Sequence, residues 1–465
     1  MKEKRMDVLI IGGGASGLMA AITAARAGCR VLILEHKEEP GKKILATGNG
    51  RCNFTNTVQG SECYRGSTPA FVLQCLELFG AQNAIDFFKE IGIWTKDREG
   101  YCYPRSMQAV TIRDGLLQEV RRLHVSVKCD VGIRKIQKEN GVFRVQSKEG
   151  DFYGKTCILA TGGAASPQSG SDGSGYLYAK QLGHSCIEPV PALVPLHANE
   201  TWLKQVKGVR AEGVVTLLVD GKEIAASGGE LQLTDYGISG IPTFQVSRYA
   251  ARALKENNTV MAIVDFLPEV SEGELIQWLT DRLAEKRNTP EQVLNGLLNQ
   301  KLAHALTENW RKVANGKQTG AERKADGLRK TARELAAHVK RTRLQITGTG
   351  NFKQAQVTAG GIDTREVQAG TMESKLTEGL YFAGEILDVD GICGGYNLQF
   401  AWSSGMIAGR CAAGNAEKKS IEKKSIEKKN IEKKRNINKK PMEKKPVKKY
   451  AEKKYTQKTR RTART

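Results

Sequence analysis

Three glycines near the N-terminus have a spacing that suits the binding of a phosphate. Gly12, Gly14 and Gly17 follow the short apolar run 8–11 and precede a segment, 15–27, that is rich in Ala, Leu and Met. The first glycine permits a tight turn, the second leaves room for a pyrophosphate, and the third lets a helix pack closely on a strand. The N-terminus of that helix would offer free N–H groups and a positive dipole end to the phosphates.

An acidic residue completes this pattern. Glu35 closes the next apolar run, 31–34. A carboxylate at this place accepts hydrogen bonds from both ribose hydroxyls, which favours an adenosine without a 2′-phosphate. The strand, the glycine turn, the helix and the acid form one βαβ unit, and together they predict a dinucleotide site.

Two later segments indicate which dinucleotide binds. Residues 158–163 and 379–385 both read as a buried strand that ends in glycine, and 394–398 opens a helix after the second strand. This combination resembles FAD proteins of the glutathione-reductase-like superfamily. The resemblance implies that Glu385 holds a hydroxyl or phosphate region on the flavin side. It also implies that the helix near Gly395 stabilises negative charge on the reduced flavin.

Longer strings of residues resemble one bacterial flavoprotein family. They are 48–56, 355–361, 372–375 and 384–399. The family consists of BaiN-like, or aminoacetone-oxidase-family, NAD(P)/FAD-dependent oxidoreductases, and the resemblance covers roughly residues 1–412. It implies an α/β fold, in which a glutathione-reductase-like FAD-binding Rossmann domain carries an inserted β-barrel and a helical subdomain. It also implies FAD as the cofactor, with NADH or NADPH as a transient electron donor.

The residues expected to contact the cofactor come from these motifs and from the polar loop after the first βαβ unit. They are Gly12, Gly13, Gly14, Ala15, Ser16, Gly17, Glu35, Lys42, Lys43, Gly50, Arg51, Cys52, Val131, Thr161, Gly162, Gly384, Glu385, Gly394, Gly395, Tyr396, Asn397 and Leu398. For the charged loop residues, a solvated surface charge is the alternative, and for Cys52 it is a small buried side chain.

The composition changes after 189–195 and again near 343, which predicts a discontinuous FAD-binding domain. Residues 1–195 and 343–412 would form that domain, and 196–342 would form the insert. Within the insert, 196–265 reads as β-barrel-like and 266–342 reads as mainly helical.

Most of the net charge lies in the C-terminal tail. The chain holds 72 Lys+Arg and 50 Asp+Glu, a net charge of +22, and residues 415–465 supply 21 and 6 of these, or +15. We expect this tail to be disordered. Two interpretations stay open: an electrostatic arm that contacts RNA, DNA or an anionic surface without sequence specificity, or a neutral solubilising extension.

The cysteine pattern and the hydropathy exclude several classes of protein. No two of the 10 cysteines are separated by only two residues, so no zinc ribbon, iron–sulfur cluster or other metal site is expected. Their scatter through a large chain is typical of reduced thiols, which predicts a cytoplasmic location. No run of 18 apolar residues exists, so no transmembrane helix is expected.

The family resemblance also implies a reaction. One family member reduces ring double bonds of 3-oxo bile acids. We therefore expect NAD(P)H-linked reduction of a carbonyl-conjugated double bond in a small hydrophobic substrate, by hydride transfer through the flavin. Two alternatives stay open: a flavin-dependent enzyme that modifies RNA bases and uses the basic tail, and a non-enzymatic flavin redox sensor.

For the proton donor of such a reaction we expect a tyrosine or solvent and not a histidine. Among the six histidines only His36 lies in a cofactor motif, and it is at the adenosine end. Asp235 stands where the family often has His, so an acid–base role for that position does not carry over. Tyr396 and Tyr236 are the candidate acids. For both residues, packing against the flavin or the insert is the alternative.

Overall fold

Three stretches of the chain are described by the computed structural model: residues 5–285, 288–313 and 325–414. The tail for which disorder is expected, 415–465, lies outside these described residues.

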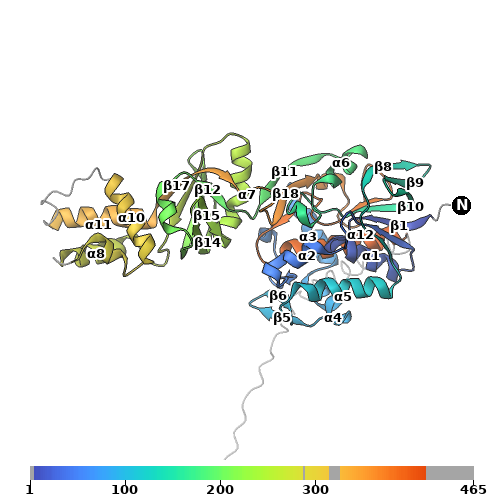
Figure 1. Cartoon of the computed structure of the whole chain (residues 1–465), viewed down its shortest axis with the longest axis horizontal. Coiled ribbons are helices and arrows are strands. Elements are labelled where there is room, and N and C mark those ends of the chain that lie inside the picture. The colour runs from blue at the N-terminus through green and yellow to red at the C-terminus, as the bar shows by residue number, and fades with distance from the viewer. Residues whose placement is uncertain (1–4, 286–287, 314–324, 415–465) are drawn as a thin grey trace, which may run out of the picture. The chain divides into compact units, whose positions relative to one another are not determined.

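A seven-stranded sheet carries the glycine turn and Glu35. Its strands β1, β8, β9 and β10 lie side by side in Figure 1. Its order is β7-β2-β1-β10-β9-β8, and β19 also pairs with β10. The strands are β1 (Met6–Ile11), β2 (Val31–Leu34), β7 (Ser126–Lys128), β8 (Ile133–Glu139), β9 (Val142–Ser147), β10 (Gly150–Leu159) and β19 (Leu380–Phe382). Because β2, β1, β10 and β19 run in parallel, their carboxyl ends meet at one edge of the sheet, where open α/β sheets bind ligands.

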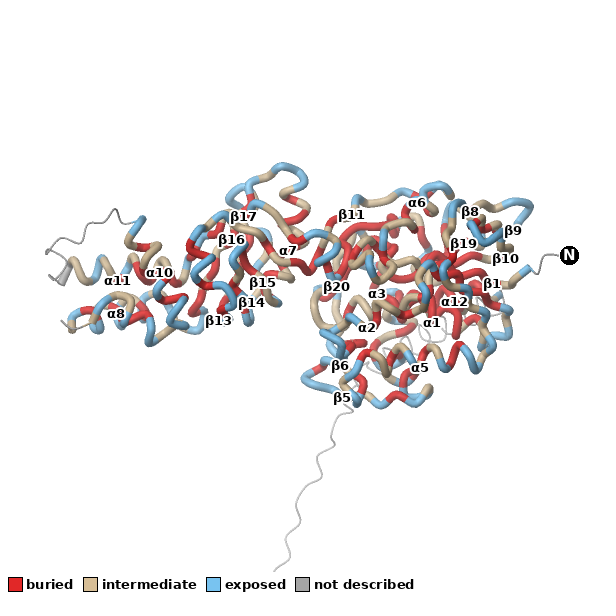
Figure 2. The backbone as a smooth tube through the Cα atoms, in the orientation of Figure 1, coloured by how far each residue is buried: buried red, intermediate tan, exposed pale blue. Residues whose placement is uncertain are grey.

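Two helices that begin at this edge pack directly on each other. They are α1 (Ala15–Arg26) and α12 (Tyr396–Ala413), and Figure 2 shows that both are largely buried. A Cβ on Gly405 of α12 would lie 2.4 Å from the carbonyl oxygen of Ser16, and one on Gly409 would lie 2.3 Å from that of Ala20. The two glycines therefore allow the helix backbones to touch.

Further helices and strands belong to the same part of the chain. They are α2 (Lys42–Ala46), β3 (Thr55–Asn56), β4 (Tyr64–Arg65), α3 (Pro69–Leu78), α4 (Ala81–Glu90), β5 (Thr95–Arg98), β6 (Tyr101–Pro104), α5 (Ala109–Arg122), α6 (Ser174–Gln181) and β20 (Asp390–Gly391).

The expected β-barrel is present as a closed six-stranded barrel in the order β12-β15-β14-β13-β16-β17. Its strands are β12 (Leu196–Ala198), β13 (Arg210–Val219), β14 (Lys222–Thr234), β15 (Gly237–Gly240), β16 (Val260–Asp265) and β17 (Thr342–Thr349). Strand β17 spans residue 343, at which the sequence predicts the return to the FAD-binding domain, so the barrel extends to Thr349. The physical reason is that β17 pairs with both β16 and β12 and so closes the barrel.

The described residues between β16 and β17 form the helices α8 (Glu272–Ala284), α9 (Pro290–Leu294), α10 (Gln300–Val313) and α11 (Ala325–Lys340). At the start of α8 the Ser271 hydroxyl accepts the Glu274 N–H at 3.2 Å, which satisfies a helix-end donor. The buried side chains of these helices and of the barrel interior form one hydrophobic cluster, so the two parts share a core.

The chain enters and leaves the barrel through two paired strands, β11 (Cys186–Ala192) and β18 (Val357–Ile362), which are antiparallel. Helix α7 (Ile241–Lys255), which follows β15, also connects the barrel to the rest of the described body. Its Arg248 forms an ion pair with Asp390 of β20 at 3.0 Å, and the hydroxyl of its Tyr249 accepts a hydrogen bond from Arg65 at 3.1 Å.

No helix in the described stretches combines the length and the apolarity that crossing a bilayer requires.

Substituting Gly405 tests the contact between α1 and α12. We expect Gly405→Ala to lower the free energy of unfolding by about 1–3 kcal/mol, because the added methyl meets rigid backbone. Gly273→Ala on α8 is the matched control, since open space surrounds Gly273. Urea unfolding measures both variants, and equal midpoints for Gly405→Ala and the wild type would contradict this packing.

Substituting Asp390 tests the buried charge beneath α7. Burial raises the pKa of Asp390 from 3.8 to about 6, although Arg248 opposes the rise. The folded state then binds a proton more readily than the unfolded chain, so this contribution to stability falls as the pH rises from 3.8 to about 6. Asp390→Asn is expected to remove that slope from unfolding curves measured across this range. Asp281→Asn on the exposed face of α8 is expected to keep it.

Candidate active site

A cavity of about 900 Å³ lies at the carboxyl ends of the parallel strands. The residues that follow β1, β2, β10 and β19 all contribute to its wall. Most of the predicted cofactor contacts line it, namely Gly12, Gly14, Ala15, Ser16, Glu35, Lys42, Lys43, Val131, Thr161, Gly162, Glu385, Gly394, Gly395, Asn397 and Leu398. The fold therefore brings residues that are distant in sequence to one site.

The glycine turn has the geometry that its spacing suggests. Gly12 has φ +99°, and a Cβ there would lie 2.6 Å from the carbonyl oxygen of Ala160. A Cβ on Gly17 would lie 2.0 Å from the carbonyl oxygen of Gly12, so only glycine fits at this position in the first turn of α1. Gly14 has no atom within 4 Å of its Cβ position, which leaves open space in front of the helix N-terminus. Gly17 thus shapes the turn without lining the cavity.

Glu35 is buried beside this turn and is held in place by backbone donors. Its Oε2 accepts the Gly13 N–H at 2.7 Å, and its Oε1 accepts the Lys37 N–H at 2.9 Å. A carboxylate has about four acceptor sites, so two bonds leave capacity for two more donors. Because Glu35 also lines the cavity, a pair of ribose hydroxyls can occupy that capacity.

An ion pair forms part of the cavity wall between two distant segments. Lys43 of α2 donates to Glu385 at 2.6 Å, and Glu385 also accepts the backbone N–H of Thr358 at 2.8 Å. Lys42 pairs instead with Glu38, one turn away. The negative charge of Glu385 is therefore compensated by Lys43. Through its two hydrogen bonds, the Glu385 carboxylate connects α2 to β18.

The N-terminus of α12 opens onto the same cavity. Gly395 caps this helix with φ +94°, and the Asn397 side chain bonds both backbone groups of Gly391, at 2.8 and 2.9 Å. The first N–H groups of α12 have no acceptor among the described residues and carry the positive end of the helix dipole. A group that gains negative charge is stabilised at this position.

Comparison with known proteins identifies the family. The sequence matches the family described as "HI0933-like protein Rossmann domain" over residues 6–411. The chain belongs to the HI0933-like Rossmann family. This membership confirms the expected fold class and the assignment of the chain as an FAD-dependent oxidoreductase.

Two curated relatives match almost the whole body of the chain. One is a 3-dehydro-bile acid delta(4,6)-reductase of Clostridium scindens, 43% identical over 408 residues, 87% of this chain and 98% of the relative. The other is a ribosomal RNA dihydrouridine synthase of Escherichia coli, 31% identical over 405 residues, 86% of this chain and 96% of the relative. Among solved structures, a 3-ketosteroid-delta4-(5alpha)-dehydrogenase from Rhodococcus jostii RHA1 aligns at a TM-score of 0.45 and 16% identity, covering 89% of this chain and 98% of the other.

The observed groups of this HI0933-like protein fit FAD. The open space at Gly14 suits the pyrophosphate, Glu35 has spare acceptor capacity for a ribose, and the α12 N-terminus suits an electron-rich ring. One more group fits: the side-chain oxygen of Asn53 is buried without a hydrogen-bond partner and lies 2.9 Å from the Cβ position of Gly395. An N–H on the edge of a flavin ring would satisfy it.

Several predicted contacts lie outside the cavity wall. Gly50 and Arg51 are exposed, and Cys52 is fully buried, with its thiol pKa raised to about 12 by burial. The reason is a run of positive φ angles, 55° at Gly48, 52° at Asn49 and 78° at Gly50, which turns this loop. As a result Gly48, Asn49 and Asn53 face the cavity instead.

Three other predicted contacts support the wall from behind. Gly13 donates to Glu35, Gly384 lies against the Ser16 side chain, and Tyr396 is buried edge-on against Tyr64 with ring centroids 5.7 Å apart.

Neither tyrosine named as a candidate acid lines the cavity. Burial raises the pKa of Tyr396, whose ring packs within the protein. Tyr236 lies between β14 and β15, where its ring packs edge-on against His197 at 5.1 Å, and Asp235 beside it pairs with Lys207. The ring that Tyr236 contacts belongs to β12 of the barrel, as the packing alternative expects, whereas Tyr396 packs on Tyr64 of β4, outside the insert.

The sequence analysis missed the side chains at the far end of the cavity. They are Tyr101, Tyr103, Leu193, Ile241, Phe244, Gln245 and Ile392. Those on α7 come from the insert and reach the cavity only through tertiary contacts. The one available signal was their spacing on a helix, which is equally typical of an ordinary core face.

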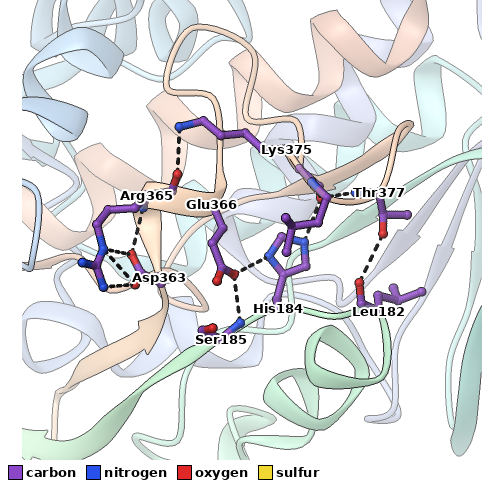
Figure 3. A network of polar contacts seen from close by, with 10 residues as sticks. Leu182, His184, Ser185, Asp363, Arg365, Glu366, Lys375 and Thr377 are labelled. Carbon is purple, nitrogen blue, oxygen red and sulfur yellow. Dashed lines mark hydrogen bonds and ion pairs between the residues drawn. The ribbon is translucent and has the colours of Figure 1, made fainter.

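A polar network joins His184 and Glu366, as Figure 3 shows, and neither residue lines the cavity. His184 bonds Ser374 at 2.8 Å and Glu366 at 3.1 Å, and burial lowers the pKa of His184. The Ser374 oxygen also accepts the N–H groups of Leu376 and Thr377, and its residue is 4% exposed. Both lone pairs of the Ser374 oxygen accept backbone N–H groups, and the side chain is not accessible to a substrate. Ser374 therefore has a structural role and is not a nucleophile.

Substituting Glu35 tests the adenosine end of the site. We expect Glu35→Gln to weaken FAD binding about 10- to 100-fold, because charge-assisted bonds to the turn and to the ribose are lost. Fluorescence titration of FAD into the apoprotein measures the dissociation constant. Glu77→Gln on the exposed side of α3 is the control. An unchanged affinity in Glu35→Gln would exclude Glu35 from the binding site.

Proposed function

We propose that this HI0933-like protein reduces a carbonyl-conjugated carbon–carbon double bond in a small hydrophobic substrate. The reducing equivalents would come from NADH or NADPH and pass through FAD, held by the cavity-lining residues described above. One observation carries the proposal: a single cavity joins the dinucleotide turn to a far end that is apolar and lies beside the α12 N-terminus. A substrate there would lie next to the redox-active ring.

The relative that is 43% identical supports this class of substrate. Its name, 3-dehydro-bile acid delta(4,6)-reductase, denotes reduction of ring double bonds conjugated to a 3-oxo group on an apolar skeleton. The far end of the present cavity has the matching character, with Leu193, Ile241, Phe244 and Ile392 in its wall.

The roles of the protein residues follow from the geometry. FAD, when bound and reduced, supplies the hydride. The α1 N-terminus and Glu35 hold the dinucleotide end, and the α12 N-terminus stabilises negative charge near the ring. The apolar wall excludes water from the substrate, which strengthens every electrostatic contact around it.

A second candidate is reduction of a uracil ring in RNA. Two relatives, 31% and 32% identical, are named ribosomal RNA dihydrouridine synthase, and the uracil double bond is also conjugated to a carbonyl. The tail charge of +15 would favour a polyanion. The uncharged far end of the cavity and the higher identity to the bile-acid enzyme favour the first candidate.

We also propose a cytoplasmic location and polyanion contact for the tail. Eight cysteines, at positions 52, 63, 75, 102, 129, 157, 186 and 393, are free thiols, which suits a reducing compartment. Loss of salt-sensitive RNA retention on deleting 415–465 would support the contact, and unchanged retention would oppose it.

Two half-reactions test the function. We expect anaerobic NADH or NADPH to bleach the flavin bands, and a 3-oxo-4,6-diene bile acid then to restore them, while the saturated 3-oxo acid does not. Stopped-flow absorbance records both steps. Restoration by ribosomal RNA alone would favour the second candidate. Failure of either donor to bleach the flavin would contradict nicotinamide-linked reduction, and a protein that stays colourless with added FAD would contradict the whole proposal.

A further inference from the structure

Helix α7 presents one face to the far end of the cavity. Ile241, Phe244 and Gln245 all line the wall, and their spacing of three and four residues places them on the same side of the helix. Ile241 is 58% exposed although it is large and apolar. Phe244, Leu193 and Ile392 line the same cavity, and a largely apolar wall with a few polar groups is typical of a small-molecule site.

Charge is distributed unequally along the cavity. The charged side chains of the wall come from the segments that follow β2, β7, β9, β10 and β19, namely Glu35, His36, Glu39, Lys42, Lys43, Asp130, Lys148, Glu149, Asp172 and Glu385. α7 contributes none. The side chains that share its end are Leu193 and Ile392, the ring of Tyr101, and the amides of Gln354 and Gln356. A neutral, largely apolar ligand with hydrogen-bond acceptors is complementary to this end.

Gln245 is the polar group on the α7 face, and its amide is oriented by the backbone. Its Oε1 accepts the N–H of Cys393 at 3.3 Å, immediately before the glycines that begin α12. The reverse orientation would put two donors face to face, so the hydrogen-bond pattern fixes which end is oxygen. The Nε2 group then has no acceptor among the described residues and is available to a ligand.

Three contacts hold α7 where this amide is needed. Arg248 pairs with Asp390, Tyr249 bonds Arg65, and the Ser247 hydroxyl accepts the backbone N–H of Val194 at 3.3 Å. The residues that follow Gln245 on α7 are thus tied to positions outside the barrel, among them Arg65 and Asp390. A donor that is preorganised in this way loses little entropy when it binds a ligand.

We propose that Nε2 of Gln245 donates a hydrogen bond to the substrate carbonyl oxygen, while Ile241 and Phe244 pack against the apolar ring that bears it. This inference rests on the proposed function and names its substrate subsite. The ligand class is a flat enone whose ring is uncharged, with its carbonyl oxygen directed at α7.

The reaction explains why a donor is needed there. When a hydride adds to the β-carbon, a new C–H bond forms and the double-bond electron pair shifts so that the oxygen becomes an enolate. NADH or NADPH is oxidised overall, the enone is reduced, and a solvent proton completes the α-carbon. Gln245 keeps its own protons throughout and stabilises the oxygen as it gains charge.

Gln245→Glu separates this role from a structural one. The carboxylate keeps an acceptor for Cys393 but removes the donor, so we expect NADH to bleach the flavin at the wild-type rate. Reoxidation by the 3-oxo-4,6-diene bile acid should slow by about 100-fold. Gln245→Met, which removes both groups at similar volume, should show the same selective loss. Gln232→Glu, the same change on the exposed face of β14, should leave both steps unchanged.

The outcomes distinguish the two levels of the proposal. Normal bleaching with slow reoxidation in both Gln245 variants supports the subsite. If the wild type is reoxidised and both variants match it, the subsite is wrong and the proposed function stands. If the enone fails to reoxidise the wild type, the proposed function is wrong and the subsite falls with it.

Discussion

The direct contact between α1 and α12 is the constraint on which the active site depends. Ser16 lies beside Gly405 and Ala20 beside Gly409, so the two helices run in the same direction. At 1.5 Å per residue, the first turn of α12 then extends about 12 Å past that of α1. Two positive helix ends therefore reach one cavity at different depths, the first where phosphates fit and the second where the ring fits. A side chain at either glycine would change both the separation and the depth.

The rest of the cavity wall consists of a charged region and an uncharged region. Around Glu35 the wall is ionic, and the Lys43–Glu385 pair closes this region with its charges mutually compensated. Beyond that pair the wall is apolar and amide-bearing. The anionic dinucleotide and the uncharged ring of the proposed substrate therefore suit different ends of the cavity, since burying an unpaired charge at the apolar end is strongly unfavourable.

The sequence predicts the parts of the site that are local and fails where tertiary contacts decide. Gly12, Gly17 and Glu35 are predictable because each acts through the strand or helix beside it. Cys52 is misjudged because several left-handed residues turn its loop, and non-glycine residues such as Asn49 give little warning of that. The face of α7 is missed because nothing in its own segment marks it, and ion pairs from distant positions bring it to the cavity.

The paired strands β11 and β18 make the insert a branch on a two-stranded stem. The α7 residues that we assign to substrate recognition lie between β11 and β18 in the chain. The residues that we assign to the dinucleotide lie before β11 or after β18. Relatives that share this architecture bear the names of a bile-acid enzyme and of an RNA enzyme. On the proposed division of roles, substitutions within this branch alone would change the substrate and leave the dinucleotide site in place.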